Sequence, residues 1–125
     1  MIADEGTQPT VNTDCIFCKL ASRAIPSKAV WEDDDIFAFD DMNPQANVHV
    51  LFIPKRHISS LALLDESDVE LIGKLMLAAA QVAKNRGIAE SGYRVLTNVG
   101  RDGGQSVDHL HLHLLGGRPM GWPPG

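Results

Sequence analysis

Hydrophobic and polar residues alternate from His109 to His113, where leucines separate three histidines. A period of two is the period of a β-strand, whose successive side chains point to opposite faces. We therefore predict a strand with all three imidazole rings on one face, neighbouring rings being about 7 Å apart at their Cα atoms. The apolar face continues through Leu114, and the strand is expected to end at Gly116.

Residues 67–86 have a different periodicity, with apolar residues at the spacing of an amphipathic helix. Asp65 or Ser67 can cap its start, and Lys84, Arg86 and Gly87 are typical of a helix end. We interpret this helix as a packing element without chemistry of its own. Its apolar positions are Val69, Ile72, Leu75, Met76, Ala79, Val82 and Ala83.

The remaining elements are shorter. We predict a short helix over Cys15–Ser22 and strands over Ala29–Trp31, Ile36–Phe39, Val48–Ile53 and Tyr93–Asn98. Strands first, one long helix next and two strands last indicate an α+β fold with a mainly antiparallel sheet. Residues 1–13 are polar and are expected to form a loose tail, which leaves 14–125 as one domain.

Composition narrows the class of protein. The chain has 125 residues, of which 44% are hydrophobic, and a net charge of −5. No segment carries a basic stripe, so nucleic acid is not expected as a main partner. No apolar run approaches the length of a membrane span, and the first residues resemble no signal peptide. We therefore expect a cytoplasmic protein.

The histidine row is the main candidate for chemistry. Histidine titrates near physiological pH, so a cluster of three favours metal binding or acid–base and nucleophilic catalysis. The loop Gly100–Ser106 leads directly into the row, and its glycines would let backbone N–H groups converge on an anion. Three strand histidines could instead ligate zinc. However, no further acidic residue or histidine follows them to complete a site.

Cys15 and Cys18 are the only cysteines. Their Cys-x-x-Cys spacing favours metal binding or redox chemistry over a structural disulfide in a cytosolic protein. No βαβ pattern accompanies the pair, so a thioredoxin-like role is less favoured, and a reduced, metal-free pair is the alternative.

Several segments together resemble the histidine triad (HIT) family, and in particular its Hint branch. The resemblance covers roughly residues 14–125, and its motifs are Phe39–Gln45, Ile53–His57, Gly103–Ser106, His109–Leu115 and Gly116–Gly125. It implies a five-stranded antiparallel sheet with one long and one short helix. It also implies a homodimer in which the two sheets form one continuous ten-stranded sheet.

The resemblance implies a purine nucleoside phosphoramidase, which hydrolyses the P–N bond of nucleoside 5′-phosphoramidates. His111 matches the nucleophile, and His113 matches a phosphate ligand. His49 matches a further active-site histidine that orients the central one, and His109 completes the triad. Ser106 and the Gly104 amide are expected near the leaving group and the phosphate, with Asn98 in the same pocket. Neutral imidazole is a competent nucleophile towards phosphorus, so this chemistry needs no catalytic cofactor.

Nucleoside recognition follows from the same resemblance. Asp41 matches the residue that binds the ribose hydroxyls, a role that suits a carboxylate acceptor. An apolar slot for the base would be formed by Ile16, Phe17, Leu20, Phe39, Met42 and Leu51.

Some relatives hold a structural zinc at positions that match Cys15, Cys18, His57 and His109. Two thiolates and two imidazoles form a closed tetrahedral set, which is typical of structural zinc. The resemblance also implies that Trp122 reaches the active site of the partner subunit; packing on its own subunit is the alternative.

Three positions depart from the common pattern of the family. Val99 replaces a frequent glutamate, Asp40 a frequent histidine, and Asp108 a frequent aromatic residue. None removes a catalytic group, but Asp108 adds a charge near the triad and bears on leaving-group preference. The alternative functions are a dinucleoside polyphosphate hydrolase of another branch and a non-catalytic nucleotide-binding scaffold protein.

Overall fold

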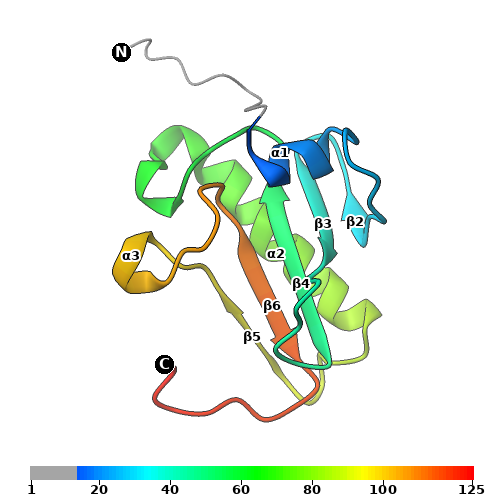
Figure 1. Cartoon of the computed structure of the whole chain (residues 1–125). Helices are drawn as coiled ribbons and strands as arrows, with labels where there is room; N and C mark the ends of the chain where they lie inside the picture. The colour runs from blue at the N-terminus through cyan, green and yellow to red at the C-terminus, as the bar shows by residue number, and fades with distance from the viewer. Residues whose placement is uncertain (1–13) are drawn as a thin grey trace.

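The computed structural model describes residues 14–125; the tail predicted for residues 1–13 lies outside the described residues. Its five-stranded sheet has the order β2-β3-β4-β6-β5, and every neighbouring pair is antiparallel (Figure 1). The α+β class and the antiparallel sheet predicted from the sequence are thus confirmed. The elements are α1 (Ile16–Ala21), β2 (Trp31–Glu32), β3 (Ile36–Asp40), β4 (Val48–Pro54), η1 (Leu61–Leu63), η2 (Glu66–Asp68), α2 (Val69–Asn85), β5 (Tyr93–Leu96), α3 (Gly100–Gly103) and β6 (Leu112–Gly116).

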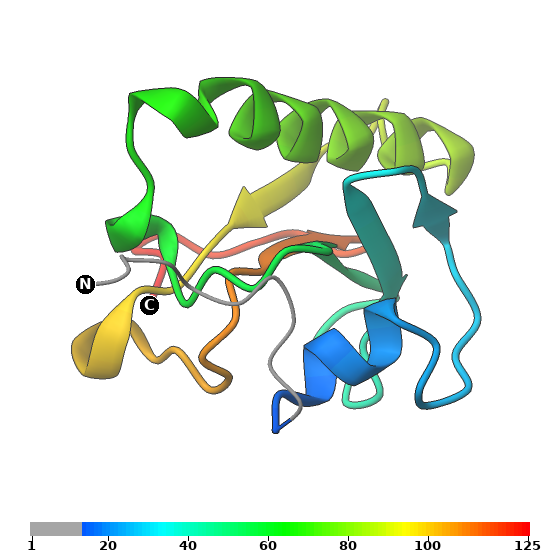
Figure 2. The same ribbon diagram turned by 90° about the horizontal axis from the view of Figure 1, so that it is seen from above.

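The sheet separates two layers. Figure 2 shows α2 running along one face, with α1 and α3 on the other. The long helix and the short N-terminal helix agree with the predicted pair, and α3 is an additional single turn. Among the described residues, no helix is long and apolar enough to cross a lipid bilayer.

Alternation along the strands divides the core between these two layers. Val50 and Phe52 of β4 pack in the cluster beneath α2, whereas Leu51 and Ile53 pack in the cluster beneath α1. Leu110, Leu112 and Leu114 all belong to the α2 cluster, so the histidines between them face α1. The predicted separation of leucines and histidines onto opposite faces is therefore confirmed.

The strand itself is shorter than predicted, because β6 begins at Leu112 rather than at His109. Phe52 pairs with Leu112, so continuing this register would bring Pro54 opposite Leu110. Proline has no amide hydrogen to donate to a ladder. Its carbonyl accepts a hydrogen bond from the His109 ring instead, at 2.8 Å. A side chain thus takes the place of the next ladder bond, and regular pairing stops.

The loop before the histidines also differs from the prediction. Residues Gly100–Gly103 form α3, and β5 ends at Leu96 rather than at Asn98. The amide of Gly104 donates to the Arg101 carbonyl at 3.1 Å, and Gly104 ends the turn with a φ of 79°. This left-handed conformation is the one that glycine adopts without steric cost.

Candidate active site and metal centre

The three histidines of the row have three different sets of partners, although they share one face. His109 lies against the two cysteines, and His113 lies against His49. His111 lies between them, and its ring is edge-on to Phe17 at a centroid distance of 5.1 Å. The row is therefore two sites side by side rather than one cluster.

The first site is formed by the predicted zinc ligands, which the fold brings together from three segments. The donor atoms of Cys15, Cys18, His57 and His109 all lie within 4.8 Å of one another. Nδ1 of His109 is 3.3 Å from the Sγ of Cys15, and Nδ1 of His57 is 3.3 Å from the Sγ of Cys18. Two thiols and two imidazoles at such distances can enclose a tetrahedral ion.

The hydrogen bonds of His109 agree with a metal ligand. Its Nε2–H donates to the Pro54 carbonyl, so its Nδ1 carries the lone pair that faces the thiols. Metal-bound histidines usually donate their second N–H to such an acceptor, which fixes the tautomer. His109 has no exposed surface, and burial lowers its pKa to about 4, so the ring is neutral as a ligand must be. The residues present fit zinc.

The second site is a chain of hydrogen bonds that starts at a backbone amide. The amide of Gln45 donates to Nδ1 of His49 at 3.0 Å, so a neutral His49 carries its hydrogen on Nε2. That Nε2–H donates to Nδ1 of His113 at 2.9 Å. The remaining hydrogen of His113 is then on Nε2, a buried atom that has no partner within the protein. The chain therefore ends in a donor available to a ligand.

Asp41 joins this second site, with a carboxylate oxygen 3.4 Å from Nε2 of His49. The Asp41, His49 and His113 donor atoms also lie within 4.8 Å of one another, as in a metal site. Here, however, the second nitrogen of His49 accepts a hydrogen bond instead of donating one. A metal on Nε2 would require a hydrogen on Nδ1, facing the Gln45 amide. The tautomers thus favour a hydrogen-bond chain at this site and a metal at the first.

Burial keeps both histidines of this chain neutral. Desolvation lowers the pKa of His113 to about 4, with further lowering by His111 and His49 and an opposing effect of Asp41. Desolvation also lowers the pKa of His49, against the attraction of the Asp41 carboxylate. At neutral pH neither His49 nor His113 is therefore an imidazolium ion, as the tautomers of this hydrogen-bond chain require.

His111 is the cavity-lining histidine whose free ring nitrogen carries a lone pair. Its Nδ1–H donates to the His109 carbonyl at 2.7 Å, which leaves the lone pair on Nε2. The carbonyl of His111 accepts from Thr97 Oγ1 at 2.7 Å, so the backbone is held as well as the ring. This arrangement holds the ring in an orientation that a histidine nucleophile would need.

The cavity beside His111 has a volume of about 240 Å³ and a mainly apolar lining. It brings together most of the residues predicted to bind a nucleotide and adds Val107. Its lining consists of Ile16, Phe17, Leu20, Phe39, Asp41, Met42, Leu51, Ser106, Val107, His111 and His113. We call it the nucleotide pocket.

Four of the residues predicted for catalysis or nucleotide binding lie outside this lining. Asn98 is half-buried after the end of β5, and the amide of Gly104 is engaged within the α3 turn. His49 lies behind His113 and contacts that ring, rather than the central histidine that it was expected to orient. His109 belongs to the cysteine cluster, although it was also counted with the catalytic histidines.

Sequence reasoning missed two residues that support the site. Gln105 donates to the carbonyls of Ser59 and Val107, and its Oε1 accepts from the Gly100 amide. Together with Thr97, it holds the loop and the row in place. The only signal in the sequence was their position beside the motif, because hydrogen bonds to distant carbonyls leave no periodic pattern.

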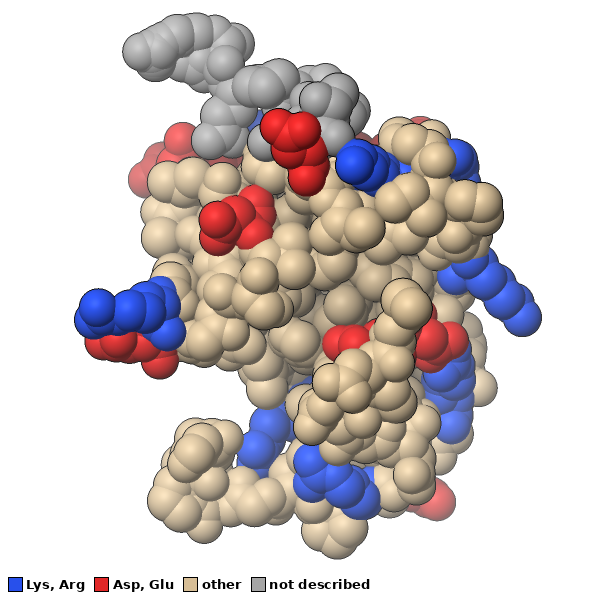
Figure 3. Space-filling model, viewed as in Figure 1, with Lys and Arg blue, Asp and Glu red and all other residues tan. Residues whose placement is uncertain are grey.

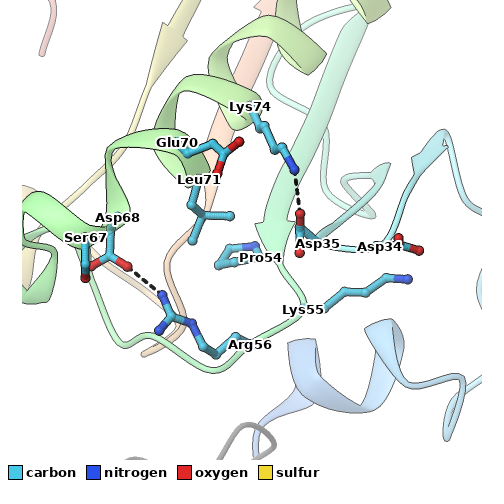
Figure 4. Close-up of a pocket in the computed structure, with 10 residues that line it drawn as sticks. All are labelled: Asp34, Asp35, Pro54, Lys55, Arg56, Ser67, Asp68, Glu70, Leu71 and Lys74. Carbon is cyan, nitrogen blue, oxygen red and sulfur yellow. Dashed lines mark hydrogen bonds and ion pairs between the residues drawn. The ribbon is translucent and has the colours of Figure 1, made fainter.

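Two further cavities lie outside the nucleotide pocket. One, of about 400 Å³, lies between the start of α2, the turn before β3 and the end of β4 (Figure 4). Two ion pairs bridge its lining: Lys74 pairs with Asp35 and Arg56 pairs with Asp68, each at 2.7 Å. The other is an open hollow beside the cysteine cluster.

Trp122 is 84% exposed, so the alternative that it packs on its own subunit is wrong. The tail that carries it is held to β5 by a hydrogen bond from Arg94 to the Gly121 carbonyl, at 2.8 Å. A large aromatic side chain on a held segment is available for contact with another molecule.

Comparisons with known proteins show which family the chain resembles. Residues 14–121 match the family described as scavenger mRNA decapping enzyme C-terminal binding. A 14 kDa zinc-binding protein of Zea mays is 50% identical over 112 residues, which cover 88% of this chain and 87% of the relative. The adenylylsulfatase HINT1 of Arabidopsis thaliana is 47% identical over 112 residues, which cover 88% of this chain and 76% of the relative.

A solved structure is similar throughout. The HIT family hydrolase of Legionella pneumophila superposes with a TM-score of 0.87 at 49% identity, covering 89% of this chain and 99% of the other. A fold of this kind with a histidine row on its sheet defines a histidine triad protein, and the chain belongs to the HIT family. The HINT1 relative agrees with the Hint branch predicted from the motifs.

Proposed function

We propose that this protein hydrolyses the P–N bond of purine nucleoside 5′-phosphoramidates through a covalent nucleotidyl-histidine intermediate. The observation that carries the proposal is the orientation of His111, whose Nδ1–H is bound to a backbone carbonyl. Its Nε2 lone pair is thereby directed to the nucleotide pocket, which has a mainly apolar lining suited to a purine base. The hydrolase description of the Legionella relative supports the same class of activity.

The reaction has two balanced steps. In the first, Nε2 of His111 attacks phosphorus and the P–N bond breaks. The amine leaves with the bonding electron pair and takes a proton from water through the Ser106 hydroxyl, at the edge of the pocket. In the second, water attacks phosphorus and releases the nucleoside monophosphate. The imidazole returns to its neutral state, and the proton of the attacking water passes to solvent.

His113 would stabilise the charge on phosphorus. Its unpartnered Nε2–H is a donor that a phosphoryl oxygen can accept, and such preorganised donors stabilise the transition state. His49 acts through His113 as a positioning residue. Asn98 and the Gly104 amide remain proposed contacts near the phosphate, the latter after its hydrogen bond to Arg101 lengthens.

The nucleoside would lie between α1 and the sheet. The apolar residues Ile16, Phe17, Leu20, Phe39, Met42 and Leu51 would contact the base. The Asp41 carboxylate would accept hydrogen bonds from the ribose hydroxyls. Since Asp41 also faces His49, it would connect the ribose end of the pocket to the phosphate end.

We propose a structural zinc ion at Cys15, Cys18, His57 and His109. When bound, it would cross-link α1, the segment after β4 and the residues before β6. His109 is assigned to this centre rather than to catalysis, because its Nδ1 faces the thiols and its Nε2 faces a carbonyl. The zinc-binding protein of Zea mays supports this assignment.

We also propose a homodimer joined through β5. This strand is an edge of the sheet, and an edge with unpaired backbone groups is a template for a second copy. Exposed apolar side chains lie on β5 and on α2, among them Tyr93 and Leu77. Pairing two β5 strands would produce the ten-stranded sheet that the resemblance implies.

Other nucleotidyl compounds could react with His111 by the same first step. The Arabidopsis relative is named an adenylylsulfatase, and a dinucleoside polyphosphate hydrolase is the alternative from another branch. These substrates differ from a phosphoramidate in the leaving group, which is an anion rather than an amine. They are therefore the natural comparisons in an assay.

The test is release of AMP from adenosine 5′-phosphoramidate by the purified protein, followed by chromatography. Adenylyl sulfate and diadenosine polyphosphate are assayed beside it. We expect the phosphoramidate to have the highest kcat/KM without added Mg²⁺, because the nucleophile is a side chain. A folded protein that binds AMP and releases none from the phosphoramidate would contradict the enzyme and favour a nucleotide-binding scaffold.

A further inference from the structure

The open hollow beside the cysteine cluster has no role in the function proposed above. Its volume is about 590 Å³, larger than that of the nucleotide pocket. We call it the acidic recess, and its lining consists of Asp14, Cys15, Ile16, His57, Ser59, Ser106, Val107 and Asp108.

The acidic recess adjoins the nucleotide pocket. Ile16, Ser106 and Val107 line both cavities. Ser106 is also the residue expected beside the leaving group, so a substituent carried past it would enter the recess. A phosphoramidate held with its base against the apolar lining and its phosphorus at His111 thus has space for the amine on the recess side of Ser106.

The charge of the recess has one sign. Asp14 and Asp108 contribute carboxylates, and no Lys or Arg is among the described residues that line it. Figure 3 shows acidic side chains on this face near the start of α1, where basic side chains also lie. A zinc ion held by two thiolates and two neutral imidazoles carries no net charge, so loading the metal centre would not offset these carboxylates.

We propose that the acidic recess is the leaving-group subsite and that Asp108 selects amines carrying a second positive charge on an aliphatic stem. The inference rests on the proposed phosphoramidase function. Ile16 and Val107 would contact the stem, and the carboxylate would attract the distal ammonium group. An anionic leaving group meets repulsion at the same place, so this subsite also disfavours sulfate.

The experiment uses three adenosine 5′-phosphoramidates of similar length, made from 1,4-diaminobutane, butylamine and 4-aminobutyrate. They differ in the distal charge, which is positive, absent or negative. For the wild-type protein we expect kcat/KM to be highest for the diamine and lowest for the aminobutyrate. The preference for the diamine over butylamine should be about 3- to 10-fold at low salt and smaller at high salt, because the recess is open to solvent.

Two substitutions of Asp108 test the assignment. Asp108→Asn should reduce the ratio of diamine to butylamine towards one, and Asp108→Lys should make the aminobutyrate the better of the two charged substrates. The matched control is Glu90→Gln, which removes one negative charge from an exposed turn outside the described cavities. It should retain the wild-type ratios. Zinc content and melting temperature are measured for each variant, since Asp108 adjoins His109.

The outcomes separate the two proposals. Hydrolysis of all three substrates with the same ratios in wild type, Asp108→Asn and Asp108→Lys would overturn the charge selection and leave the phosphoramidase function standing. Absence of hydrolysis by the wild type would overturn both. A reversal of preference in Asp108→Lys, with Glu90→Gln unchanged, would support the subsite.

Discussion

Each histidine of the row has one ring nitrogen hydrogen-bonded to a polar group of the protein, and that partner determines what the other nitrogen can do. A carbonyl acceptor leaves the lone pair of His111 for attack and that of His109 for a metal. In the hydrogen-bond chain through His49, the Gln45 amide is the first donor, and His113 is left with a free N–H instead. Neighbouring residues of one type thus acquire three proposed roles from backbone groups that cannot change their direction of donation.

Removing the imidazole of His111 tests the nucleophile. His111→Ala should lower kcat for adenosine 5′-phosphoramidate at least about 1000-fold, or roughly 4 kcal/mol of barrier. The rest of the nucleotide pocket is kept, so AMP should still bind, which calorimetry can measure. Retention of more than a tenth of wild-type kcat would show that another group makes the covalent bond.

The partly buried His113 makes stability depend on pH. Its pKa is lowered from 6.5 to about 4 in the folded protein, mainly by desolvation. Between these values the unfolded chain binds a proton that the folded protein does not, so unfolding becomes more favourable as pH falls. The contribution is complete above about pH 6.5 and is lost towards pH 4.

Urea unfolding of wild type and His113→Gln at several pH values measures this effect. The difference between the two proteins isolates His113 from the other titrating groups. We expect the free energy of unfolding to fall more steeply from pH 6.5 to pH 4 in the wild type than in the variant. Parallel curves would mean that His113 is not kept neutral by burial.

At the scale of elements, the regular periodic patterns were sufficient to predict the sheet and α2. The long helix runs from Val69 to Asn85, inside the predicted bounds, because its apolar positions recur at helical spacing over several turns. Its start was displaced because Asp65 and Asp68 form a capping box around the preceding turn η2. The strand β6 begins at Leu112 rather than at His109 because of Pro54, a residue of another strand. The sequence around the histidines therefore contains no local signal for this start.

The candidate site was predictable to a different extent. The resemblance identified the lining of the nucleotide pocket, and the alternation identified the face on which the histidines lie. Val107 was missed because its role depends on the shape of a cavity. The tautomers could not be predicted either, since they follow from contacts such as that between Gln45 and His49.

The metal centre joins elements that are distant in the sequence, so its loss should affect α1 first. The described structure predicts about one zinc per chain at equilibrium with excess metal, because the tautomers of the second cluster oppose a second ion. Cys18→Ser should reduce the zinc content below one half and lower the melting temperature. A metal at about 1000 times its Kd stabilises the folded protein by roughly 4 kcal/mol. Losing the ion should therefore lower the free energy of unfolding by an amount of this order.

The control for this prediction is His49→Gln, which alters the other cluster and should retain one zinc. Elemental analysis measures the metal, and thermal unfolding with and without a chelator measures its contribution. Two zinc ions in the wild-type protein would contradict the assignment of the two clusters. A melting temperature unchanged by both the chelator and Cys18→Ser would contradict it as well.

At the scale of the whole molecule, the sheet edge and the C-terminal tail lie together. Arg94 is in β5, the edge strand through which we propose dimerisation, and it binds the carbonyl of Gly121. The indole of Trp122 follows directly and is almost fully exposed on the single chain. A partner paired at β5 would therefore receive this tail close to its own surface, which gives the exposed indole a place to bind.

Deleting residues 121–125 tests whether the tail serves the partner's active site. We compare kcat/KM for an aromatic phosphoramidate, made from phenethylamine, with kcat/KM for the butylamine compound. This ratio should fall about 5- to 10-fold, because the aromatic substrate would lose a contact with the indole of roughly 1 kcal/mol. The melting temperature should change little, since the indole contributes almost no buried surface to its own chain.

Deletion of residues 124–125 is the matched control, because it shortens the tail and keeps Trp122. It should leave the ratio of the two substrates as in the wild type, and light scattering should report a dimer for all three proteins. A dimer whose truncated form ranks the amines as the full chain does would show that the indole acts elsewhere. A wild-type monomer with the aromatic preference would instead place Trp122 over the nucleotide pocket of its own subunit, which a rearrangement at Gly121 would have to allow.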